Sequence, residues 1–143
     1  MSRGVSLIMS LHMVRSWKEE SGFVGDQKEK VIVSAPSMGK AQKVDITEEM
    51  RLACESLVAP FSETMLDLLA AVEPEYQERV RKNVILSGRG SRIRGLAAAL
   101  EKTLVEVGGG KVTIVDDPVF AGANGGLAIA LDADESDWEK LSA

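Results

Sequence analysis

The sequence predicts an α/β fold that combines a parallel βαβ unit, a long helix and a small helix-plus-hairpin lobe. The apolar run at residues 84–86 is followed by a glycine-rich basic loop and by the helix-forming run at residues 96–100. An alternating strand pattern follows at residues 112–115, so the two strands should be parallel, with the crossover helix on one face. Residues 47–72 carry apolar side chains at every third or fourth position, which indicates a long amphipathic helix.

Composition limits the classes of protein to consider. The chain has 143 residues, of which 45% are apolar and 27% charged, as in an ordinary soluble protein of one domain or two small lobes. The net charge of −5 argues against nucleic acid as a partner. The apolar run at residues 5–14 is too short to span a bilayer, so no direct membrane insertion is expected. The single cysteine, Cys54, is predicted to be a small core residue in a reducing cytoplasm.

The N-terminal third is predicted to form a helix and a hairpin. The apolar spacing favours a helix over residues 7–20, and Ser21 and Gly22 are typical of its end. Residues 30–34 and 42–46 are strand-like, and residues 36–39 supply a turn between them. We expect this hairpin to be exposed on one side.

The predicted long helix begins at Thr47, where Glu48 and Glu49 suit a helix N-terminus. Its apolar stripe is typical of a core-facing helix rather than a cofactor site. Pro60 must kink or divide the helix, because a proline inside a helix removes a hydrogen bond and clashes with the preceding turn. Pro74 then begins a short helix, predicted over residues 75–82, that leads to the strand at 84–86.

The C-terminal third completes the βαβ unit. Leu96, Leu100 and Leu104 share one helix face. A capping acid followed by Pro118 predicts a last helix over residues 119–131, and the acidic tail at 132–143 is predicted to be a loosely held end. We expect three parts: a small lobe at 1–48, part of a larger lobe at 49–131, and the tail. With only two parallel strands the sheet has an open edge, so the isolated chain is expected to be marginally stable, self-associating or docked on a relative.

The loop after residues 84–86 is a candidate anion site. Residues 79–94 contain six cationic side chains and no acid. Gly88 and Gly90 let the backbone approach a ligand closely, and N–H groups at a helix start favour anions. The alternative is a tight turn with a solvated basic rim. A dinucleotide fingerprint does not fit, because the third glycine is Gly95 rather than three positions after Gly90.

Several longer runs resemble the C-terminal part of bacterial actin-like proteins, which have a ribonuclease H-like ATPase fold. These runs are N-V-I-L-S-G-R-G-S-R-I-R-G-L and D-D-P-V-F-A-G-A-N-G-G-L-A. Within that family the chain is most similar to the MamK group of magnetosome-associated actins, since K-V-D-I-T-E-E-M-R-L-A-C-E-S-L and P-E-Y-Q-E-R-V also match. The resemblance covers residues 18–131.

The resemblance implies an ATP-dependent filament protein in which the glycine loop lies against the nucleotide. By this resemblance Gly88, Arg89, Gly90 and Ser91 would lie by the ribose and phosphates, Arg92 and Ile93 would approach the base, and Lys18 would lie near the adenine. ATP, with Mg²⁺, is therefore the implied cofactor. Arg89 stands where the family has the middle glycine of its triplet, so its side chain would either contact a phosphate or block the pocket.

The family's two phosphate loops, and the acids that hold Mg²⁺ and orient water, have no counterpart here. Phosphoryl transfer needs these groups, so this chain alone is not expected to hydrolyse ATP. We expect a truncated cytoskeletal protein that self-associates or binds filaments of a full-length relative. Its expected place is the cytoplasm, along the magnetosome chain, where magnetosome-associated proteins are further candidate partners. The alternatives are a small nucleotide- or phosphate-binding module, a dinucleotide enzyme, and a gene remnant.

Overall fold

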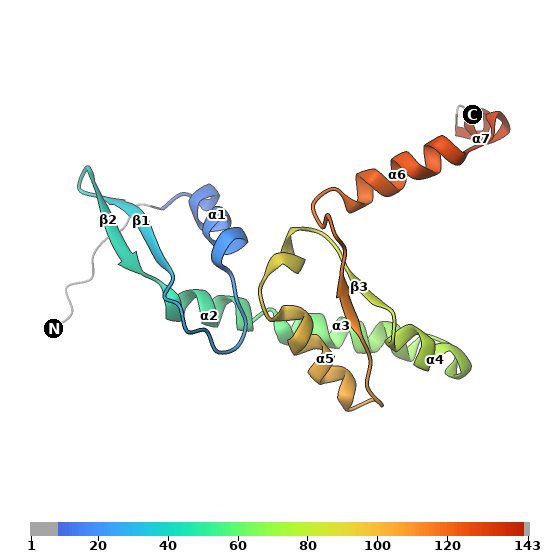
Figure 1. Cartoon of the computed structure of the whole chain (residues 1–143), viewed down its shortest axis with the longest axis horizontal. Coiled ribbons are helices and arrows are strands. Elements are labelled where there is room, and N and C mark those ends of the chain that lie inside the picture. Colours follow the sequence, from blue (N-terminus) through green and yellow to red (C-terminus); the bar gives the residue numbers. More distant parts are fainter. Residues whose placement is uncertain (1–8, 142–143) are drawn as a thin grey trace.

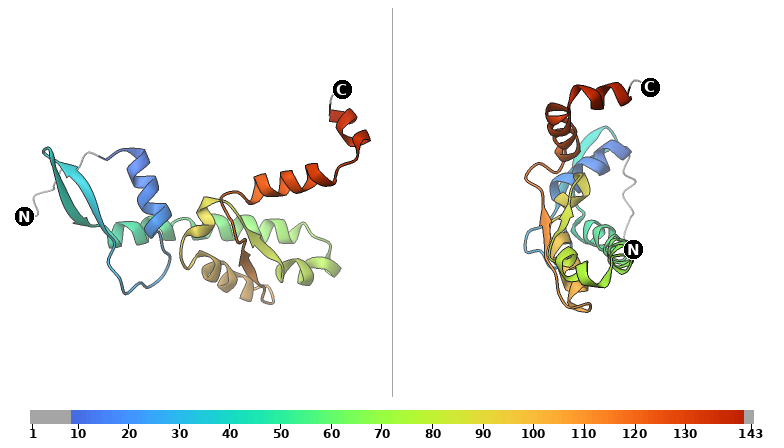
Figure 2. Two further views of the ribbon diagram at one scale, coloured as in Figure 1. Left: turned by 45° about the horizontal axis from the view of Figure 1, so that its top comes forward. Right: turned by 90° about the vertical axis from the view of Figure 1, so that its right-hand side faces the viewer.

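The computed structural model describes residues 9–141 and shows an elongated molecule (Figures 1 and 2). A hairpin with two helices forms one end, a βαβ unit with two further helices forms the middle, and the last two helices lead away from it. The helices are α1 Leu11–Ser21, α2 Thr47–Glu55, α3 Val58–Ala70, α4 Pro74–Arg81, the 3₁₀ turn η1 Arg89–Arg92, α5 Leu96–Val105, α6 Ala121–Asp132 and α7 Glu135–Leu141. The strands are β1 Ile32–Ser37, β2 Lys40–Asp45, β3 Val84–Leu86 and β4 Val112–Ile114.

Helix α1 begins later than the sequence predicted. The Oγ of Ser10 accepts a hydrogen bond from the N–H of Met13 (3.2 Å), so Ser10 is the N-cap and the helix begins at Leu11. Residues 7 and 8 of the predicted helix lie outside the described residues. The predicted end is confirmed, because the N–H of Gly22 donates to the carbonyl of Lys18 (2.9 Å) and the chain then turns away from the helix.

The predicted hairpin is confirmed, but its turn is shorter than residues 36–39. Pro36 lies within β1 opposite Ala41 of β2, so only Met38 and Gly39 form the turn. Both have positive φ, 49° and 77°, as a two-residue type I′ turn requires. In β1 the buried Val33 and Ala35 alternate with exposed residues, so the hairpin covers the core with one face only, as predicted.

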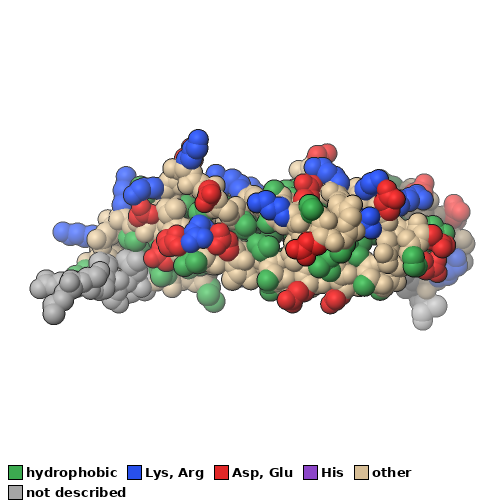
Figure 3. Space-filling view, turned by 90° about the horizontal axis from the view of Figure 1, so that it is seen from below, with side chains coloured by type: hydrophobic (Ala, Val, Ile, Leu, Met, Phe, Trp, Pro, Cys, Tyr) green, Lys and Arg blue, Asp and Glu red, His purple; other side chains and the backbone are tan. Residues whose placement is uncertain are grey.

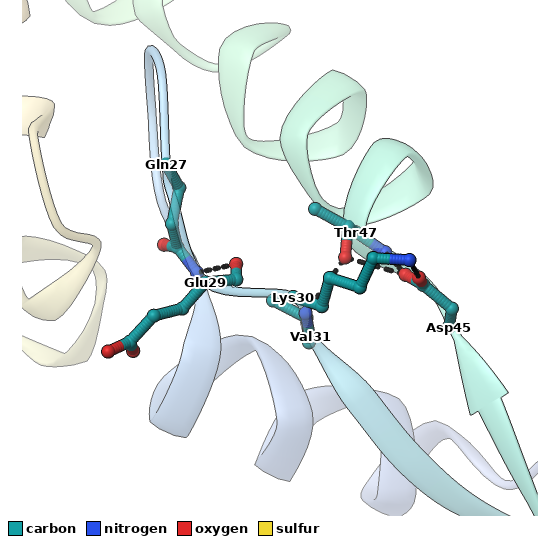
Figure 4. A network of polar contacts seen from close by, with 6 residues as sticks. All are labelled: Gln27, Glu29, Lys30, Val31, Asp45 and Thr47. Carbon is teal, nitrogen blue, oxygen red and sulfur yellow. Dashed lines mark hydrogen bonds and ion pairs between the residues drawn. The ribbon is translucent and has the colours of Figure 1, made fainter.

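A polar network joins the end of the hairpin to the start of α2 (Figure 4). The N–H and Oγ1 of Thr47 both donate to Asp45 Oδ1 (3.1 and 2.6 Å), while Thr47 Oγ1 accepts from the N–H of Val31 (2.8 Å). Lys30 Nζ lies 3.0 Å from Asp45 Oδ2. These donors favour the ionised carboxylate, first through the Thr47 hydroxyl, and lower the pKa of Asp45 from 3.8 to about 2. The network fixes Thr47 as the first residue of α2, as predicted.

The predicted long helix is divided in two, and Pro60 accounts for the break. Helix α2 ends at Glu55 and α3 begins at Val58. A proline has no N–H to donate to the carbonyl four residues earlier, and its ring crowds that carbonyl, which here belongs to Ser56. The chain therefore leaves the helix one turn before Pro60 instead of at the proline itself.

The predicted βαβ unit is confirmed. Strands β3 and β4 are parallel, with Val84 opposite Val112, and α5 is the crossover helix. Leu96, Leu100 and Leu104 are each at most 1% exposed and form the centre of the core. Among the described residues β3 and β4 form a two-stranded sheet, as the strand count predicted.

The same core extends into the N-terminal third. Phe23, Val33, Met50 and Cys54 are buried in one cluster with the three leucines of α5. Cys54 is 1% exposed, which confirms it as a core residue, and burial raises the pKa of its thiol. The division of the chain into lobes at residues 48 and 131 stays a prediction.

The last helix of the βαβ region begins at Ala121 and not at residue 119. The carboxylate of Asp117 accepts a hydrogen bond from the N–H of Phe120 (3.3 Å), and the carbonyl of Pro118 accepts one from the N–H of Gly88 (2.6 Å). These two hydrogen bonds hold residues 117–120 in a turn.

The tail, predicted to be loosely held, forms α7 with acids in its first turn and Lys140 in its last. Within residues 9–141 no helix has the length and apolar content needed to cross a membrane.

Candidate functional site

The glycine-rich loop leads into α5 at Leu96, as predicted, and within the loop residues Arg89–Arg92 form the 3₁₀ turn η1. Gly88 precedes this turn with φ 82° and ψ 169°, and Gly95 follows it in the left-handed region with φ 81°. The N–H and Oγ of Ser91 both donate to the carbonyl of Gly88 (3.2 and 2.8 Å) and close the turn. The two positions that require glycine are therefore Gly88 and Gly95, because side chains rarely adopt such φ values.

The loop is fastened to the N-terminal third of the chain by backbone hydrogen bonds. The N–H of Val24 donates to the carbonyl of Arg94 (2.8 Å), and the N–H of Arg94 donates to the carbonyl of Gly22 (3.0 Å). Phe23 thus forms a parallel bridge with Arg94, and its buried side chain joins the core. This bridge places the loop beside the end of α1.

Arg89 reaches from the loop to α1. Its Nη1 donates to Glu19 Oε2 at 2.7 Å, although 70 residues separate the two in sequence. The Glu19 side chain is only 15% exposed, while that of Arg89 is 60% exposed. The ion pair therefore links the carboxyl-terminal half of α1 to the first residue of η1.

A hollow of about 610 Å³ lies between α1 and the loop. Three cationic side chains line it, together with one acid, one histidine and one serine: Arg15, Lys18 and Arg89; Glu19; His12; and Ser16. The helical repeat places residues 12, 15, 16 and 19 on one face of α1. Since Glu19 is already paired with Arg89, the hollow carries a surplus of positive charge and suits an anionic ligand.

The structure brings together two of the predicted site residues, Lys18 and Arg89. Arg92 is exposed and does not line the hollow. Ser91 is 4% exposed and its hydroxyl is used within the turn, and Ile93 is 3% exposed and belongs to the core. A role in nucleotide binding for these residues, and for Gly88 and Gly90, stays a prediction.

Sequence reasoning missed His12 and Ser16 as residues of this hollow. The available indication was their helical spacing from Glu19, which becomes informative only once α1 is known to face the loop.

For Mg²⁺ the structure offers no ready site, since among residues 9–141 no three His, Cys, Asp or Glu side chains are grouped so that they could hold a metal ion.

The sequence and the structure were both compared with known proteins, and both comparisons find MamK proteins. No family model matches the chain. The actin-like protein MamK of Paramagnetospirillum magneticum is 36% identical over 141 residues, which cover 99% of this chain and 41% of that protein. The solved MamK double helical filament has a TM-score of 0.85 and 37% identity over 92% of this chain and 41% of that one. A non-polymerising MamK mutant bound to AMPPNP has a TM-score of 0.78 and 39% identity over 87% of this chain and 38% of that one.

The chain thus spans about 40% of the length of the relatives that it matches. Both comparisons extend over nearly the whole chain and agree at the levels of sequence and structure, as the resemblance of the loop and helix motifs predicted. The chain is homologous to the MamK actin-like proteins, and its structure is a fragment of the actin fold.

Proposed function

We propose that this chain is a MamK-type cytoskeletal protein that associates with filaments and acts in organising magnetosome chains. It binds a nucleotide, and the chain by itself does not hydrolyse that nucleotide. The observation that carries the proposal is homology to MamK over 99% of the chain, together with its similarity to the solved MamK filament. The chain corresponds to about 40% of the length of such a relative.

The hollow between α1 and the loop supports nucleotide binding. Arg15, Lys18 and Arg89 supply the positive charge that a triphosphate needs, and the backbone at Gly88 and Gly90 is open to close approach. A MamK relative was solved with AMPPNP bound, which supports a nucleotide as the anion. ATP would bring the phosphates to these cations; the ion pair of Arg89 with Glu19 would have to adjust to admit a phosphate.

The same homology supports a proposal for the partners and the location of the chain. Self-association, or docking onto filaments of a full-length MamK-type protein, is the proposed interaction. The proposed location is the cytoplasm, along the magnetosome chain, with magnetosome-associated proteins as further partners. This location is testable by fluorescence microscopy of the tagged chain in magnetosome-forming cells, where a diffuse signal would contradict it.

Co-sedimentation tests the proposal. The chain is mixed with a full-length MamK-type protein that has been polymerised with ATP, and the pellet is compared with that of the chain alone. We expect the chain to enter the pellet with filaments and to release no phosphate above background when ATP is present without them. Failure to pellet with filaments would contradict the function, and magnesium-dependent phosphate release by the chain alone would contradict its lack of ATPase activity.

A small nucleotide-binding module is the second candidate function, favoured by the cationic hollow itself. It predicts ATP binding without co-sedimentation. Replacing Arg15 by Ala should weaken ATP binding, whereas Arg79→Ala, at an exposed position of α4 outside the hollow, should not. Binding that responds to Arg15→Ala, combined with no pelleting, would select the module over the filament protein.

A further inference from the structure

The hollow between α1 and the loop offers a ligand charges and hydrogen-bond donors. Among the described residues, the side chains that line it are all charged or polar, and their only ring is the imidazole of His12, at an exposed position. Within residues 9–141 no Phe, Tyr or Trp side chain lines the hollow, and Trp17 of α1 instead lines an apolar pocket with Met50 and Cys54. Stacking of a base on an aromatic side chain strengthens binding by about fivefold or more. The lining of the hollow is therefore suited to phosphates and not to a base.

The two loop residues that were predicted to approach the base do not line the hollow. Arg92 is exposed outside it, and Ile93 is 3% exposed and packs in the core. Lys18, predicted to lie near the adenine, does line the hollow, together with the cations Arg15 and Arg89. An ammonium group among other cations attracts a negatively charged phosphate much more strongly than a neutral base. The charge of Lys18 thus favours a phosphate as its contact.

Side chains, more than the backbone of the loop, supply the donors for an anion. The N–H of Gly88 donates to the carbonyl of Pro118 (2.6 Å), and the N–H of Ser91 donates to the carbonyl of Gly88 (3.2 Å). Arg89 donates through Nη1 to Glu19 (2.7 Å), but a guanidinium has further N–H donors, and 60% of this side chain is exposed. The same guanidinium can therefore hold a phosphate as well as Glu19 once the ion pair adjusts.

The positive charge of the hollow is a local feature. The whole chain has a net charge of −5. On the face of the molecule drawn in Figure 3, acidic and basic side chains are interspersed along its length. An anion is therefore attracted by the three cations of the hollow and not by the charge of the chain as a whole.

We propose that the hollow recognises the polyphosphate group of a nucleotide and is indifferent to its base. The chain then binds ATP, CTP and inorganic triphosphate alike, with an affinity set by the number of phosphates. Because exposed charges are screened by salt, this affinity falls as the ionic strength rises. Such recognition rests on the proposed function, because the hollow is taken as the nucleotide site, and it defines the part of the ligand that the site selects.

Calorimetric titration of the full chain with four ligands tests the proposal, without magnesium so that ATP and CTP carry the same charge. ATP and CTP differ only in the base, so their Kd values should agree within about threefold, less than the gain from a stacked base. Inorganic triphosphate should bind at least as tightly as ATP, whereas AMP, with one phosphate, should bind about tenfold more weakly or less. A larger preference for either base, AMP binding as tight as that of ATP, or no binding of inorganic triphosphate overturns the proposal.

Lys18→Gln separates contact with a phosphate from contact with a base at a single residue. If Lys18 contacts a phosphate, the variant should bind ATP and inorganic triphosphate more weakly by the same factor, about threefold or more. Loss of affinity for ATP alone would show that Lys18 contacts the base, and no loss for either ligand would show that it contacts neither; both results overturn the proposal. Lys102→Gln removes the same charge at an exposed position of α5 outside the hollow, and this matched control should leave both affinities unchanged.

The titrations also separate this proposal from the proposed function. If ATP binds and inorganic triphosphate does not, the chain binds a nucleotide through its base or sugar, so nucleotide binding stands and indifference to the base is wrong. If neither ligand binds, nucleotide binding is wrong as well. Association with filaments is decided independently of both results, by co-sedimentation.

Discussion

Replacing Gly95 by Ala should destabilise the fold at the joint between the N-terminal third and the βαβ unit. Gly95 has φ 81°, and a Cβ at this position would overlap the carbonyl oxygen of Val24. That carbonyl is part of rigid backbone, held in place by the bridge between Phe23 and Arg94. The substitution therefore introduces strain and also pushes apart the two segments that fasten the loop to α1.

The magnitude follows from two contributions. Placing Ala in the left-handed region costs about 1–2 kcal/mol. Separating the bridge weakens two backbone hydrogen bonds, the N–H of Val24 to Arg94 and the N–H of Arg94 to Gly22, each worth about 0.5–1.5 kcal/mol. Gly95→Ala should thus lower the free energy of unfolding by about 2–5 kcal/mol, a large part of the ~5–15 kcal/mol of a typical domain.

Gly25→Ala is the matched control, because Gly25 has nearly the same φ, 85°, and a Cβ there would meet nothing within 4 Å. Urea denaturation followed by circular dichroism gives both free energies of unfolding. We expect Gly95→Ala to be more destabilising than Gly25→Ala by about 1–3 kcal/mol, the contribution of the bridge alone. Equal losses for the two variants would refute the reasoning, since they would show that only backbone strain matters at Gly95.

Three further predictions test the core, the hairpin junction and the hollow. Leu104→Ala, at a fully buried position of α5, should lower the free energy of unfolding by about 2–5 kcal/mol in urea; a loss below about 1 kcal/mol would mean that the core is loosely packed. Because the pKa of Asp45 is lowered from 3.8 to about 2, its ionised form stabilises the fold above pH 3.8, and this stabilisation is lost as the pH falls toward 2. Asp45→Asn should therefore reduce stability more at about pH 6 than at about pH 3, and a constant difference would contradict the depressed pKa. Glu19→Gln removes the one acid that lines the hollow, so ATP should bind about fivefold more tightly, a gain of about 1 kcal/mol in binding free energy. Arg89→Gly removes a cation and should weaken ATP binding. Calorimetry that shows the affinity changing in the same direction for both variants would contradict an electrostatic role for the pair.

Local patterns in the sequence were sufficient for most elements. The strand at residues 84–86, the parallel pairing with β4 and the burial of Leu96, Leu100 and Leu104 all follow from spacing within a few tens of residues. Thr47 as the start of α2 and the division caused by Pro60 follow from backbone chemistry that acts over one helical turn. The motifs of the loop and last helix also predicted the similarity to MamK, because several short runs had to match in the same order.

The contacts of the candidate site were decided by tertiary structure. The ion pair between Arg89 and Glu19, and the bridge between Phe23 and Arg94, join residues about 70 positions apart, and no local spacing specifies which side chains meet at that separation. The use of the Ser91 hydroxyl within the turn and the packing of Ile93 in the core are likewise tertiary contacts, and the predicted roles of these two residues in nucleotide binding stay predictions. The exposure of α6 likewise depends on which surfaces are present to cover it, because an apolar helix has the same sequence whether or not its partner is there.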